Sequence, residues 1–321
     1  MKILYISDRR PGGIVNHVKC LTSCLPKEIG RYVIGFGGDE EFAGKNGHDI
    51  REFFQIRRVV KSFKPDVVHF NTIPLFMALY LKWVNRVSKV CAIHTPSAKC
   101  VAHDRATLNW AIEPCYWLPV SKHNWDSFKS VYPRARGEVF FNPVRLSDFS
   151  SFVRVKNVAP IVGMVGRNAA QKDWPSFHKV ESLVKVERPE VSFLNAGEVA
   201  PCDGRDAIAK MDVFMMTSLH EQLPTTVLEC FALGVPICGF IPEGGMSDIL
   251  ALSNGALKTV FIAERKVEKL AQIVCQILDD ADLRQRLVDD GRHIVETYFN
   301  AEKNVRGRLM EIYHQCQKSP S

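Results

Sequence analysis

The segment that most constrains the fold is MDVFMMTSLHEQLPTTVLECFALGVPICGF, residues 211–240. Its first apolar run, residues 212–217, has the length of a strand and precedes a polar loop and a helical pattern over residues 225–233. Pro224 suits the first turn of that helix, Gly234 suits its end, and a second apolar run follows. Two apolar strands joined by a helix predict an α/β fold with a parallel sheet.

Strand-length apolar runs alternate with helical patterns along the rest of the chain, which favours parallel, doubly wound sheets. Helices are predicted at residues 14–24 and 50–63, and residues 279–316 are expected to be helical. A polar stretch without periodicity, residues 147–160, is typical of an interdomain linker. The predicted strands cover residues 2–7, 32–36, 66–70, 90–94, 117–120 and 138–141 before that linker, and 161–165, 191–195, 213–216 and 237–240 after it.

Two glutamates stand on either side of seven residues in the segment 211–240. Glu221 lies in the loop at the carboxyl end of the first strand, and Glu229 lies one to two turns into the helix. In open α/β sheets ligands bind at this edge, and a helix start offers free N–H groups and a positive dipole end to a phosphate. The pattern therefore predicts a binding site for a phosphorylated ligand.

This segment resembles the donor-binding motif of retaining GT-B glycosyltransferases, particularly family 4, the group 1 enzymes. In that motif an acidic residue, a short apolar and glycine-containing stretch and a second glutamate in a helix follow one another. Gln222 stands where the family often has glycine, and Cys230 where it usually has alanine. Neither replacement removes a charged group.

The sequence VGRNAAQKDW, residues 165–174, resembles the family's phosphate-binding loop between a strand and a helix. Arg167 and Lys172 have four residues between them, and together a planar fork and a compact charge suit a diphosphate. Asp173 stands where the family often has glycine, which puts a negative charge beside the expected phosphate site.

Three further positions match the family's order. Gly13 lies in PGGIVNHV, which resembles the glycine-rich first loop, where a missing Cβ lets backbone approach a ligand. His94 ends a predicted strand and matches a histidine near the donor sugar in relatives. Gly245, after the last predicted strand, matches a backbone-contact loop of the donor cleft.

The resemblance implies two Rossmann-like, doubly wound domains that face each other across a cleft. Residues 1–150 would bind the acceptor, and residues 151–300 would bind a nucleotide-sugar donor. Residues 301–321 would form a final helix that crosses back to the first domain. The region 196–210 is shorter than in typical relatives, so the resemblance does not transfer the identity of the nucleobase.

The implied reaction transfers a sugar from a UDP- or GDP-linked donor to a glycan, lipid-linked or other acceptor, with retention at the anomeric carbon. Glu221 would orient the sugar, Glu229 would bind the ribose, and His94 would line the sugar pocket. The other donor contacts expected are Arg167, Lys172, Gly13, Gly245 and the helix start Leu223, Pro224, Thr225 and Thr226. No carboxylate pair typical of a diphosphate-bound cation occurs in the sequence, so we expect no metal and no cofactor besides the donor.

Charge and composition bear on partners and location. Residues 1–150 hold 22 Lys and Arg against 13 Asp and Glu, so the net charge of +7 comes from the first half. This excess suggests contact with an anionic partner such as a membrane surface, whereas nucleic acid is a weaker expectation. Without a signal-peptide pattern or a bilayer-length apolar run, and with ten scattered cysteines, we expect a cytoplasmic protein, soluble or at the inner face of a membrane.

Three alternatives remain open on the sequence. A GT-B sugar-nucleotide epimerase shares the fold but not the two-glutamate frame. A non-catalytic GT-B module could bind a glycan or a partner protein. A transferase acting on nucleic acid is suggested only by the basic first half. Acceptor specificity is expected near Pro74, residues 95–103 and residues 122–125, where we recognise no motif.

Overall fold

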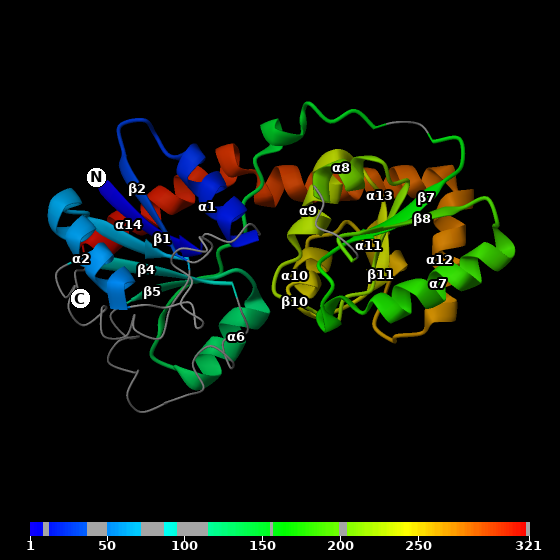
Figure 1. Ribbon diagram of the computed structural model, residues 1–321, viewed down its shortest axis with the longest axis horizontal. Helices are drawn as coiled ribbons and strands as arrows, with labels where there is room; N and C mark the ends of the chain where they lie inside the picture. The colour runs from blue at the N-terminus through cyan, green and yellow to red at the C-terminus, as the bar shows by residue number, and fades with distance from the viewer. Residues whose placement is uncertain are drawn as a thin grey trace. The chain divides into compact units, whose positions relative to one another are not determined.

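The computed structural model describes residues 1–8, 13–36, 50–71, 87–94, 115–154, 157–198 and 204–318. The chain divides into two compact units, which Figure 1 shows. The first unit joins Met1–Pro143 to Ala301–Ser321, and the second comprises Val144–Asn300. The chain therefore passes between the units at residues 143–144 and 300–301, and Val144 forms a parallel bridge with Asn300 beside both crossings.

The first unit contains a parallel six-stranded sheet in the order β2-β1-β3-β4-β5-β6. All four residues of β3 and all six of β4 are buried, as expected for central strands of a parallel sheet that is covered on both faces. The strands are β1 (Lys2–Asp8), β2 (Gly30–Phe36), β3 (Val67–Phe70), β4 (Ser88–Ile93), β5 (Tyr116–Pro119) and β6 (Arg136–Gly137).

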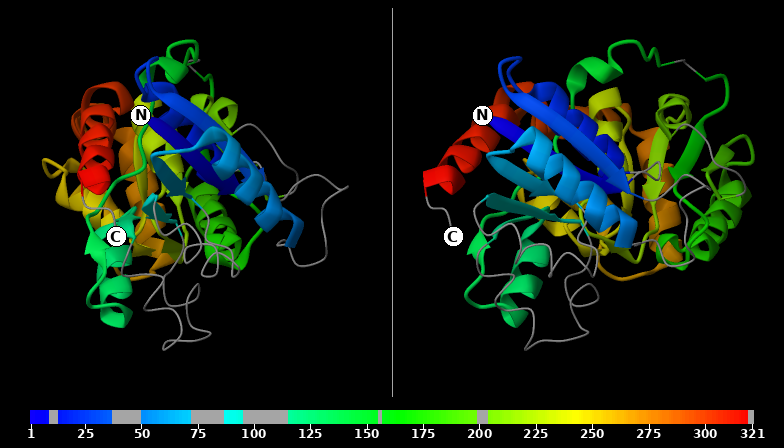
Figure 2. Two further views of the ribbon diagram at one scale, coloured as in Figure 1. Left: turned by 90° about the vertical axis from the view of Figure 1, so that its left-hand side faces the viewer. Right: turned by 60° about the vertical axis from the view of Figure 1, so that its left-hand side comes forward.

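Helices cover both faces of this sheet (Figure 2). Helix α2 (Ile50–Phe63) and helix α6 (Lys122–Val131) pack on one face through Ile56 and Phe128. Helix α1 (Gly13–Cys24) and the C-terminal helix α14 (Arg306–Lys318) pack on the other. The end of the chain thus completes the core of the first unit.

The prediction of a strand at residues 138–141 is wrong. The ladder of β6 ends at Gly137, although the backbone N–H groups of Glu138 and Phe140 still donate to the carbonyls of Trp117 and Pro119 in β5. Only one side of the ladder continues, so the segment is irregular. Its side chains serve another purpose, because Glu138 accepts hydrogen bonds from Arg308 of α14.

The second unit contains a parallel five-stranded sheet in the order β13-β11-β9-β7-β8. Helix α7 packs against α12, and α9 packs against both α8 and α13. The strands are β7 (Ile161–Val165), β8 (Ser192–Ala196), β9 (Val213–Met216), β11 (Ile237–Phe240) and β13 (Phe261–Ile262). The helices are α7 (Trp174–Glu187), α8 (Gly204–Ala209), α9 (Thr225–Leu233), α10 (Met246–Ala251), α11 (Ala256–Val260), α12 (Val267–Asp279) and α13 (Ala281–Ile294).

The described residues of the expected linker, 147–154 and 157–160, belong to the second unit. A 3₁₀ turn, Leu146–Phe149, buries the Phe149 ring, and the Arg154 guanidinium donates to the carbonyl oxygens of Gly234 and Met211. These side chains prevent the stretch from acting as a free tether. The boundary expected at residue 150 accordingly lies at residues 143–144.

The helical run predicted for residues 279–316 is interrupted. The stretches Val295–Phe299 and Ala301–Val305 are π-helical, and Asn300 between them has extended backbone. This break coincides with the second crossing between the units, at residues 300–301. Among the described helices, none is both long and apolar enough to cross a membrane.

Candidate functional site

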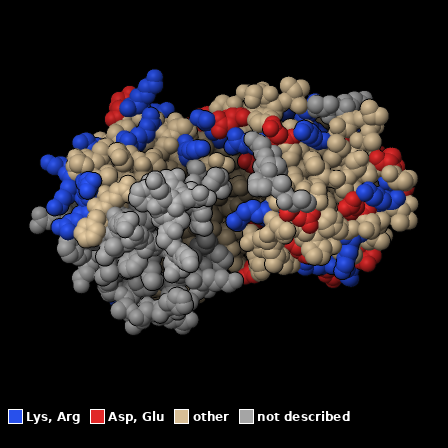
Figure 3. All heavy atoms as spheres, viewed as in Figure 1, with Lys and Arg blue, Asp and Glu red and all other residues tan. Residues whose placement is uncertain are grey.

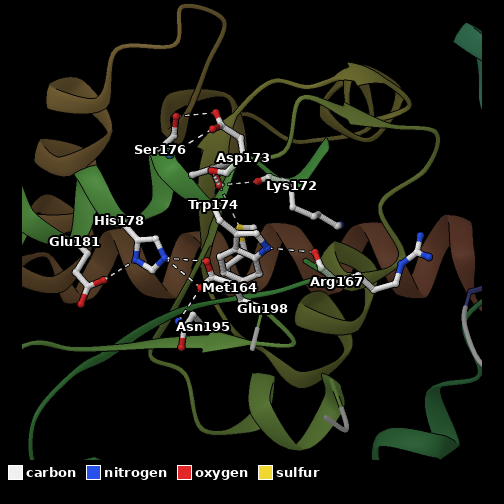
Figure 4. A network of polar contacts seen from close by, with 11 residues as sticks. Met164, Arg167, Lys172, Asp173, Trp174, Ser176, His178, Glu181, Asn195 and Glu198 are labelled. Carbon is white, nitrogen blue, oxygen red and sulfur yellow. Dashed lines mark hydrogen bonds and ion pairs between the residues drawn. The ribbon is translucent and has the colours of Figure 1, made fainter. Parts of the chain in front are cut away.

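The candidate site lies at the carboxyl edge of the second sheet, where β7 and β9 end. The loop after β7 carries Arg167, which is exposed, and Lys172, which ends a 3₁₀ turn, Ala170–Lys172. The indole of Trp174 is buried and donates to the Arg167 carbonyl oxygen at 3.2 Å, which holds the backbone of this loop in place. Figure 4 shows the Arg167 and Lys172 side chains extending to the same side, away from His178 and Glu181.

Lys172 and Glu221 form an ion pair across the two loops. The Lys172 ammonium lies 2.5 Å from Glu221 Oε1, and both side chains are only 13% exposed. The Ser218 hydroxyl donates to the same oxygen at 2.9 Å. The structure therefore brings together the expected phosphate ligand and the expected sugar ligand.

Glu221 does not lie in an irregular loop, as the sequence predicted, but in a two-residue strand. Strand β10 (His220–Glu221) pairs in parallel with β12 (Glu243–Gly244), with Glu221 opposite Gly244. The Gly245 N–H donates to the Glu221 carbonyl oxygen at 2.8 Å. This N–H group, expected to contact a donor, thus holds the glutamate backbone in place.

Asp173 occupies a left-handed backbone conformation, with φ of 51°, where the family often has glycine. Aspartate tolerates this conformation better than most residues because its short side chain can bond locally. Its carboxylate caps helix α7 by accepting from the Ser176 N–H and hydroxyl. In Figure 4 this carboxylate turns toward Ser176 and away from the end of the Lys172 side chain.

Arg265, which follows β13, neutralises Asp173 and was not predicted as a site residue. Its guanidinium lies 2.5 Å from the Asp173 carboxylate and also donates to the carbonyl oxygens of Thr217 and Ser218. Burial opposes ionisation of Asp173, but hydrogen bonds from Ser176 and Arg265 outweigh it and lower the pKa of this carboxyl. Nothing in the local sequence marks Arg265, because its partner is 92 residues away.

Helix α9 begins at Thr225, with Leu223 and Pro224 buried before it. No side chain caps this helix start, so no capping side chain accepts from the first-turn N–H groups, which include those of Thr225 and Thr226. One turn further on, the Glu229 carboxylate lies 3.3 Å from Nε of Arg205 in helix α8. Arg205, like Arg265, was not predicted as a site residue.

Gly13 and His94 belong to the first unit. Helix α1 begins at Gly13, and its His17 ring packs edge-on against the His94 ring, with centroids 4.6 Å apart. Burial lowers the pKa of His94 to about 4, and burial together with His94 lowers the pKa of His17. Both rings are therefore neutral at pH 7, and the His94 Nε2 has no hydrogen-bond partner in the described structure.

His17 lies in the glycine-rich segment PGGIVNHV, but no pattern in that segment marks it as a site residue. The expected acceptor positions Pro74 and 95–103 lie outside the described residues. The start of α6, residues 122–125, is described, and its Asn124 is buried and donates to the Ile93 carbonyl oxygen. Across the described part of the chain, no group of three His, Cys, Asp or Glu is arranged to hold a metal ion.

Residues 152–294, most of the second unit, match the family model described as glycosyl transferases group 1. The chain is 33% identical over 100 residues to the lipopolysaccharide core biosynthesis glycosyltransferase LpsE of Rhizobium meliloti. It is 29% identical over 122 residues to the putative teichuronic acid biosynthesis glycosyltransferase TuaC of Bacillus subtilis. These matches cover 31% and 38% of this chain, but only 28% and 29% of the two relatives.

Solved structures resemble the whole chain. The crystal structure of Anabaena HepE in complex with UDP-glucose has a TM-score of 0.72 at 13% identity and covers 98% of this chain and 100% of that one. Sucrose-phosphate synthase from Thermosynechococcus elongatus has a TM-score of 0.66 at 15% identity, with 98% of each chain covered. The chain therefore has the GT-B fold. Its resemblance to group 1 glycosyltransferases is confirmed for residues 152–294.

Proposed function

We propose that this protein is a retaining glycosyltransferase that uses a nucleotide diphosphate sugar, linked to UDP or GDP, as donor. The observation that carries the proposal is the Lys172–Glu221 pair beside Arg167 and the uncapped start of α9. It lies in the part of the chain that matches group 1 glycosyltransferases. HepE, which shares the fold, was crystallised with UDP-glucose and with UDP.

The chemistry follows from where charge develops. Cleavage of the glycosidic bond builds negative charge on the leaving diphosphate and positive charge on the sugar ring. Arg167, Lys172 and the N–H groups at the start of α9 would stabilise the diphosphate, whereas Glu221 would accept hydrogen bonds from the sugar hydroxyls. The neutral His94 would donate to or accept from a sugar hydroxyl, and Gly13 would leave room for the ligand.

Glu229 would bind the ribose, with Arg205 holding its carboxylate. Gly245 would act through Glu221, whose backbone it fixes. The fixed cations of the second unit supply the positive charge that a metal ion supplies in other transferases. We therefore propose that the enzyme works without a metal, and that activity survives dialysis against EDTA.

The test is a thermal-shift panel with UDP, GDP, ADP and TDP. A shift with one diphosphate that is lost in the Arg167→Ala, Lys172→Ala double variant supports the donor site. Lys185→Ala with Arg188→Ala is the matched control, because it removes two cations from the other end of α7. No shift with any nucleotide would favour the non-catalytic binding module.

Sugar nucleotides of the selected base then test the reaction. Release of the diphosphate, with the sugar first appearing in the donor's anomeric configuration, supports a retaining transferase; the inverted anomer contradicts retention. Conversion of one sugar nucleotide to another without diphosphate release would instead identify an epimerase. The acceptor is proposed to be a glycan or lipid-linked glycan.

We also propose that the first unit contacts an anionic membrane. Lys and Arg side chains gather over α2 in Figure 3, and the exposed apolar residues Tyr32, Val33 and Phe54 lie on β2 and α2. The Tyr32 ring contacts the Phe63 ring of α2, which joins the two elements into one surface. Basic groups beside exposed aromatic side chains suit a membrane interface.

Sedimentation with vesicles tests this contact. The protein should bind phosphatidylglycerol vesicles and should not bind phosphatidylcholine vesicles. Binding to phosphatidylglycerol vesicles should weaken as salt is raised, and also in the Arg58→Glu, Lys61→Glu double variant. Equal binding to duplex DNA would contradict the membrane assignment and favour a nucleic-acid acceptor.

A further inference from the structure

We propose that Arg265 is a positioning residue of the phosphate site that acts through Asp173. This inference rests on the proposed function. It adds the residue that neutralises the negative charge of Asp173 beside the expected diphosphate ligands. Three segments meet at Arg265: the loop after β7, the loop after β9 and the chain between β13 and α12.

The first step is the charge of Asp173. This residue directly follows Lys172, the expected diphosphate ligand, and its carboxyl is ionised because its pKa is lowered. Left alone, a carboxylate beside a cationic loop repels a diphosphate. The Arg265 guanidinium at 2.5 Å cancels that charge locally.

The second step is geometry. Arg265 also donates to the Thr217 carbonyl oxygen at 2.6 Å and to the Ser218 carbonyl oxygen at 3.2 Å, while its guanidinium lies 4.4 Å from the centre of the Phe240 ring. These contacts fix the planar group in one orientation. Arg265 thus donates three hydrogen bonds to Asp173 and the loop after β9.

The third step is what the contacts connect. The Thr217 hydroxyl donates to the Lys172 carbonyl oxygen at 3.0 Å, and the Leu219 N–H donates to the Gln171 carbonyl oxygen at 2.7 Å. Arg265 therefore completes a clasp between the loop of Lys172 and the strand end that leads to Glu221. Loss of Arg265 would leave the Asp173 carboxylate bonded to Ser176 but without its counter-ion.

A double-mutant cycle tests the inference by isothermal titration of UDP, GDP, ADP and TDP, using the diphosphate that the wild type binds most tightly. Arg265→Met should weaken binding about tenfold, since it exposes the Asp173 charge. Asp173→Asn keeps the helix cap and should tighten binding severalfold. The double variant should return to within about twofold of the wild type, because the two charges are removed together.

Two further measurements separate this role from a structural one. The loss of diphosphate affinity in Arg265→Met should become smaller as NaCl is raised from about 0.05 M to about 0.5 M, because salt screens a partly exposed charge. Arg188→Met is the matched control: it removes an ion pair at the opposite end of α7 and should leave the affinity unchanged.

The outcomes are distinct. If the double variant binds as weakly as Arg265→Met, Asp173 does not mediate the effect and the inference is overturned while the proposed function stands. If Arg265→Met fails to fold, Asp173→Asn alone decides, because unchanged or weaker binding contradicts the inference. If the wild type binds no nucleotide diphosphate, both proposals fail.

Discussion

Gly244 is the position where one added methyl group should displace the candidate catalytic glutamate. It pairs with Glu221 in the β10–β12 ladder and has φ of +125°. A Cβ at Gly244 would lie 1.9 Å from the Glu221 carbonyl oxygen and 2.7 Å from the Glu221 carbonyl carbon. Both are backbone atoms, so no side-chain rotation can relieve the contact.

The size of the effect follows from these distances. Ordinary contacts begin at 3.4 Å, so the two backbone segments must separate by about 1.5 Å, the difference between 3.4 and 1.9 Å. The Lys172–Glu221 ion pair, now 2.5 Å long, would not survive such a shift. A misplacement of about 1 Å costs on the order of a hundredfold in rate, and the strained φ costs about 1–3 kcal/mol in stability.

Gly255 is the matched control for backbone strain. Its φ of +126° is almost the same, but a Cβ there meets nothing within 4 Å. Both Gly244→Ala and Gly255→Ala should lower the unfolding midpoint of the second unit. Only Gly244→Ala should also lower the rate of diphosphate release from the sugar nucleotide about a hundredfold.

The assay compares donor turnover with binding of the free diphosphate. Because Glu221 is assigned to the sugar and competes for Lys172, Gly244→Ala should reduce turnover without reducing affinity for the free diphosphate. Wild-type turnover by Gly244→Ala would refute the assignment of Glu221. An equal loss of turnover in Gly255→Ala would show that general strain is the cause.

Two further predictions concern stability. Tyr313→Phe removes a buried hydroxyl that bonds Tyr5 at 2.8 Å and His69 at 2.7 Å, so it should cost the first unit about 2–4 kcal/mol, against about 1 kcal/mol for Tyr5→Phe. Hydrogen exchange of β1 and β3 amides measures both, and equal effects would contradict the reasoning. Hydrogen bonding to Glu198 is the main cause that raises the pKa of His178, so the stability His178 adds is fully present below pH 6.5 and lost as pH rises through its folded pKa. The urea midpoint of the second unit should therefore differ more between wild type and His178→Gln at pH 5.5 than at pH 9, and a constant difference would exclude the linkage.

The local pattern was enough to predict elements whose causes are local. Helix α9 and strands β7, β9 and β11 occur over the residues expected, because buried parallel strands are apolar throughout. Gly234 ends α9 with φ of 67°, a conformation that glycine adopts without strain. The two motifs in the second unit were also recognisable, because each lies within one short segment.

Features that depend on distant partners were not predictable. Strand β10 exists only because β12, more than twenty residues later, pairs with it. Asp173 could be seen to carry a charge in the wrong place, but its counter-ion lies 92 residues away. The boundary between the units lies at residue 143 and not at residue 150, because Phe149 and Arg154 pack and bond within the second unit. Composition does not reveal these contacts.

The Lys172–Glu221 ion pair implies that Glu221 and the donor diphosphate compete for Lys172. Lys172 pairs with Glu221, so a diphosphate that binds the lysine competes with that carboxylate. The displaced glutamate then becomes available to the sugar, which couples phosphate binding to sugar recognition. Glu221→Gln removes the competitor and should tighten binding of the free diphosphate about five- to tenfold, while it abolishes the preference for the sugar nucleotide. Lys172→Met should weaken binding of both the free diphosphate and the sugar nucleotide. Titration calorimetry of the wild type and the two variants measures six affinities, for the free diphosphate and for the sugar nucleotide. A Glu221→Gln variant that binds the free diphosphate more weakly than the wild type would refute the competition.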